Sequence, residues 1–380
     1  MTVLERADAS LARLRSSVAG EALWLVSLSG LAAIHLASLT PAFLRPDLID
    51  FSAFVDNASA WLSGTPYPAT SRDPNTPHAI LVFVPFVFLP LRLGLAIWIG
   101  VTYLCFFLTL RAVSRELGLR MSGAMRVTLV AFALATPPSR DVFVNGNMVW
   151  PLALVFTAAW RLARRERLSR AAAVLGVLAT VKPFLGMFGL LFLVRRRWSA
   201  LGAMTAAALV TLALALGVTG SSAFLAWFDA VGRITWYDVR FNSSVFGFLA
   251  RVCRPDAIAW GVVLVALTAG TVGVLRSRAA SLSGDWLFVF LAALLASPLG
   301  WRYYLCLIVG PLVATLLRAP VRGFAVAALG ALAVSPVPSL TSASPVLLAT
   351  VGSIPMWTAL CAWFVFASPR TDVEHPKETR

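Results

Sequence analysis

Apolar runs close to membrane-spanning length recur along almost the whole of this 380-residue chain. A helix needs roughly 20 apolar residues to cross the hydrocarbon core of a bilayer. Charged residues make up only 13% of the chain, against roughly a quarter in a soluble domain. Because a backbone in lipid has to satisfy its own hydrogen bonds, the spanning segments must be helices. The sequence therefore predicts an all-α, polytopic membrane protein.

The apolar runs predict about twelve transmembrane helices, several of them short. One further apolar segment, 79–90, is only about twelve residues long, contains Pro85 and ends at Pro90. We expect it to form a helix that lies in the outer membrane interface. The expected spans are 22–42, 93–112, 126–139, 148–162, 170–182, 184–195, 199–218, 257–276, 284–297, 303–318, 322–340 and 346–367.

The basic residues predict the topology. The net charge is +15, but the arginines lie in short clusters between apolar spans, as the positive-inside rule expects, and this pattern argues against nucleic-acid binding. Both termini are then cytoplasmic. The expected organisation is a cytoplasmic amphipathic lead-in, a membrane domain and a polar cytoplasmic tail, over 1–20, 21–368 and 369–380. The expected outer loops are 43–92, 139–148, 219–256 and 297–303.

Cysteine and histidine are too scarce to build a familiar metal or disulfide framework. Three of the four cysteines fall inside apolar spans, and the chain has no CxxC pair and only three histidines. We therefore expect neither a disulfide framework nor a His-based metal site. The Ala- and Arg-rich composition hints at a bacterium of high GC content, so the expected location is a bacterial plasma membrane.

Two carboxylates follow the first span, in the stretch DFSAFVDNASAWLSGTPYP that starts at Asp50. On a helix, the spacing of six between Asp50 and Asp56 separates them by about 120°, so they do not form a paired general acid and base. Asp50 also suits the N-cap position of a helix. Asp56 suits a solvated helix face.

Basic and amide side chains gather in the same outer loops. A lysine at the end of an apolar span, such as Lys182, costs free energy unless it meets water or an anion. Both snorkelling to the interface and phosphate binding satisfy that requirement. Arg302 beside Trp301 is in a similar position. Turn chemistry alone would explain most of the amides and hydroxyls in these loops, which include Asn145, Asn147, Asn242, Ser243 and Ser244.

Five motifs in order, over about residues 25–310, resemble glycosyltransferase family 87, whose members use polyprenyl-phosphate sugars. Two departures are notable: the family often has Tyr where Phe54 stands, and His where Tyr303 and Tyr304 stand. The motifs are Asp50-x3-Phe54-x3-Ala58-x3-Leu62-x-Gly64-x-Pro66-Tyr67, Asn145-Gly146-Asn147, Lys182-Pro183 with Arg195-Arg196-Arg197-Trp198, Asn242-Ser243-Ser244 with Arg251, and Ser297-Pro298-x2-Trp301.

This resemblance implies a GT-C fold and an inverting sugar transfer at the extracytoplasmic face, from a polyprenyl-phosphate donor to a glycolipid or other lipid-linked glycan, with Asp50 as general base. It favours mannose as the sugar and leaves arabinofuranose as the alternative. It implies no metal and no cofactor, because the donor brings its phosphate on a lipid. The implied donor-phosphate ligands are Lys182, Arg302, Arg251 and Arg240. The implied substrate contacts are Asp56, Tyr67, Asn145, Asn147, Asn242, Ser243, Trp301, Tyr303 and Tyr304.

Two other classes of protein remain open at this stage. Polar residues in a polytopic protein often mark a transport path. A transporter, however, more often has internal repeats and polar residues at mid-span, whereas here the polar groups gather in the loops of one face. A membrane assembly protein without catalysis would not require Asp50, so substitution of that residue separates it from an enzyme.

Overall fold

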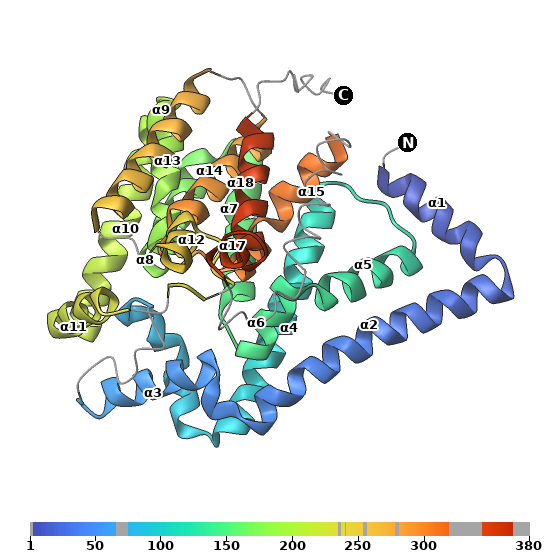
Figure 1. The fold of residues 1–380 in the computed structure, drawn as a ribbon, viewed down its shortest axis with the longest axis horizontal. Coiled ribbons are helices and arrows are strands. Elements are labelled where there is room, and N and C mark those ends of the chain that lie inside the picture. Colours follow the sequence, from blue (N-terminus) through green and yellow to red (C-terminus); the bar gives the residue numbers. More distant parts are fainter. Residues whose placement is uncertain are drawn as a thin grey trace. The chain divides into compact units, whose positions relative to one another are not determined.

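A computed structural model shows an all-helical protein (Figure 1). It describes residues 3–65, 75–234, 237–239, 241–253, 257–277, 281–318 and 344–367. Within these ranges the only extended pairing is an isolated antiparallel bridge between Asn242 and Trp301. The expected all-α class is confirmed. The expected span 322–340 and the tail 369–380 lie outside the described residues.

Five helices are long and apolar enough to cross a membrane within the described part of the chain. A bent pair, whose two helices meet at 64°, would make a sixth span, and several shorter apolar helices occupy other expected spans. The count of about twelve spans therefore stays a prediction. The five helical stretches are Val18–Leu44, Leu91–Glu116, Trp198–Thr219, Ile258–Ser277 and Val346–Ala367, and the bent pair is Gly123–Ala135 with Pro137–Asn145.

The chain divides into two compact units. The first contains Met1–Leu154, Ser221–Val231 and Leu305–Leu307. Its helices are α1 (Val3–Arg15), α2 (Val18–Leu44), η1 (Pro46–Leu48), α3 (Asp50–Leu62), η2 (Pro77–Phe88), α4 (Leu91–Glu116), α5 (Gly123–Ala135), α6 (Pro137–Asn145), the start of α7 (Val149–Arg164) and most of α11 (Ser221–Gly232).

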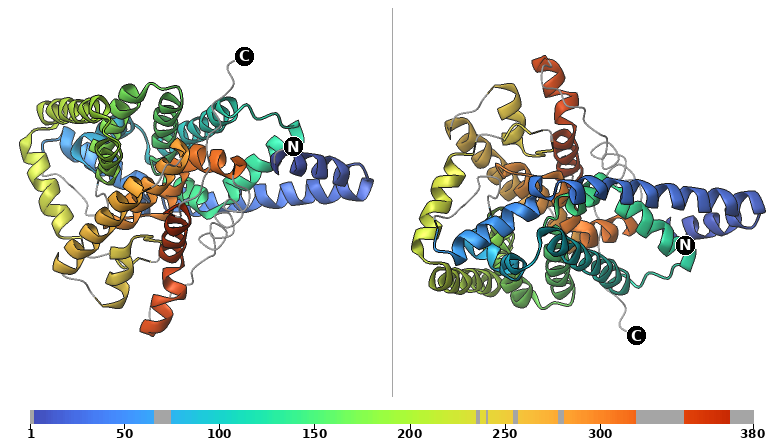
Figure 2. Two further views of the ribbon diagram at one scale, coloured as in Figure 1. Left: turned by 90° about the horizontal axis from the view of Figure 1, so that it is seen from above. Right: turned by 90° about the horizontal axis from the view of Figure 1, so that it is seen from below.

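In the first unit, α1 turns back along α2 (Figure 2). The Asp8 carboxylate on α1 accepts hydrogen bonds from the backbone N–H and the hydroxyl of Ser122, at 2.7 and 2.5 Å. Ser122 is itself the N-cap of α5, so one short side-chain cluster fixes α1 against the start of α5. Further along α2, the buried ring of His35 makes two hydrogen bonds. Its Nε2 lies 2.6 Å from the Tyr103 hydroxyl, and its Nδ1 lies 3.1 Å from the Leu134 carbonyl.

The segment expected to be an interfacial helix is the 3-10 helix η2, which packs along α3. Aromatic rings make this contact: the Phe54 and Phe83 centroids lie 4.6 Å apart, and those of Phe83 and Trp98 lie 4.7 Å apart. Because Trp98 belongs to α4, the cluster joins three elements. Large desolvated rings of this kind stabilise a packing arrangement strongly.

The second unit contains Val155–Gly220, Gly232–Tyr304 and Ile308–Arg380. Its described elements are the rest of α7, α8 (Leu168–Val181), η3 (Pro183–Met187), α9 (Phe188–Val194), α10 (Trp198–Thr219), α12 (Val245–Val252), α13 (Ala257–Ser277), α14 (Leu282–Ala296), η4 (Arg302–Ile308), α15 (Val309–Arg318), α17 (Pro345–Ala349), η5 (Val351–Ser353) and α18 (Ile354–Ala367).

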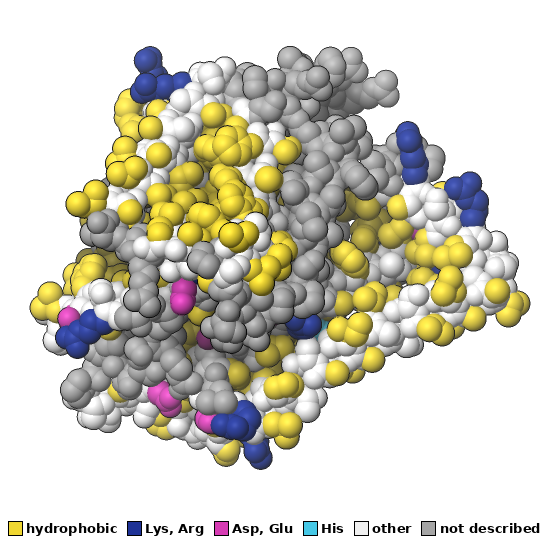
Figure 3. Space-filling model, in the orientation of Figure 1, with side chains coloured by type: hydrophobic (Ala, Val, Ile, Leu, Met, Phe, Trp, Pro, Cys, Tyr) yellow, Lys and Arg dark blue, Asp and Glu magenta, His cyan; other side chains and the backbone are white. Residues whose placement is uncertain are grey.

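Helix α14 is the core of the second unit. All of its residues from Ser283 to Ala296 are buried, as expected for a helix that is apolar on every side. Its one carboxylate, Asp285, accepts a hydrogen bond from Arg195 at 2.7 Å. Hydrophobic side chains are exposed instead on the candidate spans, over α13 and along α2 (Figure 3), where a bilayer would cover them.

Candidate active site

Asp50 is the first residue of α3. The N-cap position belongs to Ile49, whose backbone is extended, so Asp50 does not occupy the cap position for which its residue type is suited. A carboxylate in the first helical turn is favoured in its charged form, because the helix dipole is positive at this end. Asp50 is half-buried. The start of α3 therefore places a half-buried carboxylate where the helix dipole favours its charged form.

The Asn-Gly-Asn motif forms a tight turn at the end of α6. Gly146 has φ +59° and caps the helix in the left-handed conformation, and the Asn147 N–H donates to the Val142 carbonyl at 2.9 Å. A Cβ on Gly146 would lie 2.7 Å from the Cβ of Phe51. A glycine is therefore needed here both for the backbone conformation and for close approach to α3.

Two further contacts fix this turn against α3 and α4. The Trp98 indole N–H donates to the Gly146 carbonyl at 2.8 Å. The Asn147 side-chain N–H₂ donates to Asp50 Oδ2 at 2.7 Å. Asn147 is buried, with 3% of its surface exposed, so its amide is held in place by its surroundings. Two residues singled out in the sequence thus meet, while the contribution of Trp98 had no signal in the sequence.

The two other predicted polar residues of this unit do not join that contact. The Asn145 side chain donates to the backbone carbonyl of Asp141 at 2.8 Å, which is a local turn bond. Asp56 is exposed, whereas Asp50 is half-buried. Their difference in exposure agrees with the 120° separation expected from their spacing.

In the second unit, Asn242 connects two of the predicted motifs. Its Oδ1 accepts from the backbone N–H of Gly300 at 3.0 Å and from the N–H and hydroxyl of Ser244 at 3.1 and 2.8 Å. Its Nδ2 donates to the Pro298 and Tyr237 carbonyls at 2.8 and 3.0 Å. Asn242 is fully buried.

These five hydrogen bonds occupy the polar groups of the Asn242 side chain. An amide side chain has two donors and one carbonyl acceptor, and the protein itself engages both donors and the acceptor of Asn242. Asn242 therefore has a structural role in this loop, and the sugar contact expected of it stays a prediction. Next to it, the Ser243 backbone N–H donates to the Gly300 carbonyl at 2.6 Å. Among the described residues the buried Ser243 hydroxyl has no hydrogen-bond partner.

Arg251 also supports this loop. Its guanidinium donates to the Val239 carbonyl and the Ser353 hydroxyl, each at 3.0 Å, and to the Asn242 carbonyl at 3.3 Å. Burial lowers the pKa of Arg251 to about 10, so the side chain remains charged at neutral pH. Arg251 thus donates to three protein atoms and stabilises the loop without a bound phosphate.

Lys182 ends α8 as its C-cap residue and is buried, with 6% of its surface exposed. Its Nζ lies 5.2 Å from the centre of the Tyr304 ring, within the range of a cation–π interaction. Tyr303 stacks edge-on against Tyr304 at 5.0 Å, and Trp301 lies 6.2 Å from Tyr303. The residues predicted from Lys182-Pro183 and from the segment after Ser297 therefore form one cluster.

Of the remaining predicted site residues, the structure describes Arg302 but not Tyr67 or Arg240. Arg302 donates its backbone N–H to the Phe241 carbonyl at 3.0 Å, which strengthens the bridge beside Trp301. Tyr67 and Arg240 lie outside the described residues. Across the described ranges, no three His, Cys, Asp or Glu side chains come together in a group that would hold a metal ion.

Comparison with known families decides the class of this arrangement. The model of glycosyltransferase family 87 matches residues 74–299, which is more than half of the chain and includes the motifs from Asn145 to Arg251 and the start of the motif at Ser297. This chain belongs to glycosyltransferase family 87. Asp50 precedes the matched region, so its catalytic role stays a prediction for this family 87 member.

One curated relative gives the comparison more detail. The chain is 28% identical over 258 residues to a polyprenol-phosphate-mannose-dependent α-(1-2)-phosphatidylinositol pentamannoside mannosyltransferase of Mycolicibacterium smegmatis. The alignment covers 64% of this chain and 60% of the relative, so this family 87 chain spans less than two thirds of the relative's length. No solved structure matches it.

Proposed function

We propose that this chain transfers a sugar from a polyprenyl-phosphate donor to a lipid-linked glycan acceptor, with Asp50 as the general base. The observation that carries the proposal is the pairing of Asp50 with the buried amide of Asn147. An ionised carboxylate in the first turn of a helix, held in one orientation, is suited to accept a proton from a bound alcohol. Asn147 acts as a positioning residue.

The proposed reaction is a single displacement with inversion at the anomeric carbon. The acceptor hydroxyl transfers its proton to the Asp50 carboxylate, and its oxygen forms the new bond to the anomeric carbon. The bond between that carbon and the donor phosphate oxygen breaks, and the electron pair leaves with the polyprenyl phosphate. A cation near the departing phosphate stabilises the developing charge. No metal is required for this sequence of bond changes.

Lys182 is our first candidate for that cation. It is buried and lies against the Tyr304 ring, which holds an ammonium group in place without neutralising it. Arg302 is the second candidate. Arg251 is a weaker candidate than Lys182 and Arg302, because its guanidinium already donates hydrogen bonds to three protein atoms. Arg240 remains a prediction from the sequence.

Mannose is the sugar we favour, because the relative's name specifies polyprenol-phosphate mannose. The relative acts on a phosphatidylinositol pentamannoside, and we propose a glycolipid acceptor here as well. We further propose a GT-C fold with about twelve spans in a bacterial plasma membrane, both termini cytoplasmic and the reaction on the extracytoplasmic side. The apolar helices, the clustering of arginines and the family membership support this arrangement.

A transfer assay tests the proposal. The full chain in lipid nanodiscs is supplied with a glycolipid extract and with either polyprenyl-phosphate mannose or polyprenyl-phosphate arabinose. We expect transfer from the mannose donor, and a loss of about 10²- to 10⁴-fold in Asp50→Asn. Asp47→Asn is the matched control, because Asp47 is an exposed carboxylate three positions away that pairs with Arg45 at 3.7 Å.

Three results would contradict parts of the proposal. Full activity in folded Asp50→Asn would remove the general-base assignment. Transfer from the arabinose donor alone would replace mannose with arabinofuranose. Facilitated movement of a polyprenyl-phosphate sugar across the bilayer, without transfer to any acceptor in the extract, would favour the transporter class.

A further inference from the structure

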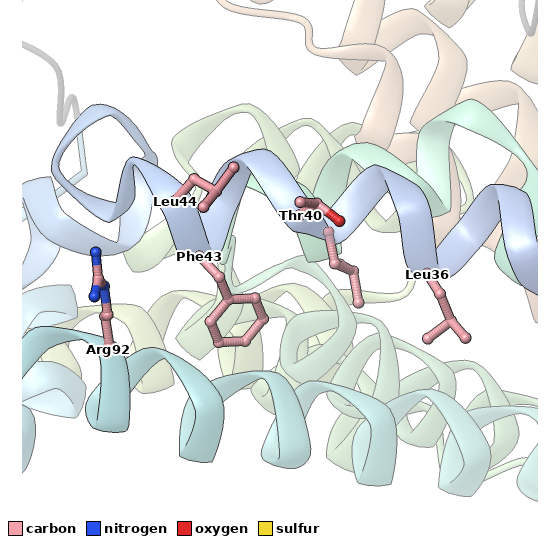
Figure 4. A pocket seen from close by; sticks show the side chains of 6 residues that line it. Leu36, Thr40, Phe43, Leu44 and Arg92 are labelled. Atoms are coloured by element: carbon pink, nitrogen blue, oxygen red, sulfur yellow. The ribbon is translucent and has the colours of Figure 1, made fainter.

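An open groove of about 540 Å³ runs between α2 and α4 in the first unit. One face of α2 lines it with residues at helical spacing, and Arg92 at the start of α4 closes one end (Figure 4). Its volume is within the usual range for sites that bind small molecules. The lining residues from α2 are Leu36, Leu39, Thr40, Phe43 and Leu44.

Arg92 has no compensating partner among the residues that the structure describes. Within the described part of the chain it forms no hydrogen bond or ion pair, and the Asp47 carboxylate is paired with Arg45 instead. Arg92 is the second residue of α4, where the positive end of the helix dipole disfavours a cation and attracts an anion. The N-cap is Pro90, whose side chain offers no acceptor. An anion beside Arg92 would therefore stabilise both the side chain and the helix end.

The rest of the groove suits a hydrocarbon chain. Four of the five α2 side chains that line it are apolar, and the other is the hydroxyl of Thr40. Both helices are long and apolar enough to span a membrane, and only 11% of the apolar window of α2 is buried within the protein. The groove is thus a lateral opening toward lipid, with its charge at one end.

We propose that this groove binds an anionic phospholipid of the surrounding membrane, with the lipid phosphate on Arg92 and one acyl chain along α2. The site has one cation and one hydroxyl, so it can recognise a phosphate and a chain. The described residues that line it include no amide or carboxylate that would recognise a sugar, and this favours a bulk phospholipid over a glycosylated substrate. The site is independent of the proposed transfer reaction.

The test counts the lipids that remain on the purified full chain in native mass spectrometry. Phosphatidylglycerol is compared with phosphatidylcholine of the same acyl chains, and undecaprenyl phosphate is added as a competitor. We expect the wild type to retain phosphatidylglycerol about five- to tenfold better than phosphatidylcholine, because one surface cation contributes about that factor to anionic-lipid binding. Arg92→Gln should abolish this preference.

Two further variants make the test specific. Thr40→Trp fills the groove at an exposed position without changing the charge, and it should lower retention of phosphatidylglycerol about as much as Arg92→Gln. Arg45→Gln removes a nearby cation that is already paired with Asp47, and it should retain the lipid as the wild type does.

Equal retention of the two phospholipids by the wild type would overturn the proposal. So would unchanged retention of phosphatidylglycerol in Thr40→Trp, which keeps the test decisive even if Arg92→Gln does not fold. Displacement of bound phosphatidylglycerol by equimolar undecaprenyl phosphate would show that the groove prefers the lipid of a sugar donor, and would also overturn it.

Discussion

The side-chain amide of Asn147 donates to the Asp50 carboxylate at 2.7 Å, across 97 positions of sequence. The two residues belong to different motifs, one at the start of α3 and the other after the turn that ends α6. The bond limits the rotation of the carboxylate, which a general base requires if it is to meet the acceptor hydroxyl at hydrogen-bonding distance.

Asn147→Ala should lower kcat by about tenfold and leave the donor KM nearly unchanged. Loss of one hydrogen bond to a charged group has an energetic cost of that order. Steady-state transfer kinetics on the folded variant measure both constants. Ser139→Ala is the control, since Ser139 is a buried residue of α6, the helix that precedes Asn147, and its hydroxyl has no partner among the described residues. A kcat within twofold of wild type would remove the positioning role of Asn147.

Gly146→Ala should destabilise the protein by about 2 kcal/mol, because the new methyl group meets Phe51 and the backbone has a positive φ. Gly118→Ala separates the two effects. Gly118 has φ +63° with nothing within 4 Å of an added Cβ, so its substitution should cost about 1 kcal/mol from conformation alone. Denaturation of both variants measures the difference. Equal losses would show that the close approach to Phe51 is unimportant.

Asn242→Ala should lower stability by about 3 kcal/mol, since it removes five hydrogen bonds that join buried loop segments. Ser243→Ala, which removes an adjacent buried hydroxyl without a described partner, should change stability by no more than about 0.5 kcal/mol. Thermal denaturation compares the two. A raised donor KM with unchanged stability in Asn242→Ala would contradict this structural role and support the predicted sugar contact.

Lys182→Gln should raise the donor KM about tenfold or more if its ammonium group binds the donor phosphate. Tyr304→Phe retains the aromatic face near Nζ and should behave like wild type, whereas Tyr304→Leu loses it and should raise the donor KM by a smaller factor of about two to five. Initial rates against donor concentration distinguish these variants. A fall in stability with an unchanged KM would make Lys182 a structural residue only.

Contact between α1 and α5 should weaken in acid. The Ser122 hydroxyl and then its backbone N–H lower the pKa of Asp8 from its ordinary value, which is about 4. A lowered folded-state pKa means that the stabilisation is complete above the unfolded-state pKa and is lost as the pH falls through the folded-state pKa. Hydrogen exchange of the α1 amides should therefore accelerate, relative to the rest of the chain, below about pH 4.

Asp8→Asn provides the control for that pH effect. An asparagine does not titrate, so protection of α1 should be weaker than in wild type at neutral pH and should not fall further through that range. Wild-type protection of α1 that stays constant down to about pH 2 would contradict the role of the Asp8–Ser122 cluster.

The sequence by itself determined the all-α class and the main apolar helices, because hydropathy and the need to satisfy backbone hydrogen bonds in lipid act locally. It separated Asp50 from Asp56, since helical rotation over six residues is fixed whatever the tertiary structure. It also singled out Asn145-Gly146-Asn147, where glycine flanked by asparagines is a turn signal, and it carried the motifs of glycosyltransferase family 87.

Only the tertiary structure decided which of these residues meet. Asn147 reaches Asp50 because Gly146 lets two backbones approach and Trp98 holds the turn, and none of these contacts follows from residue spacing. The same reason applies to Asn242: its position in a loop does not reveal that packing brings four residues around it, which make five hydrogen bonds with its side chain. Local patterns specify helices and turns, whereas partners distant in sequence are chosen by the packing of side chains in three dimensions.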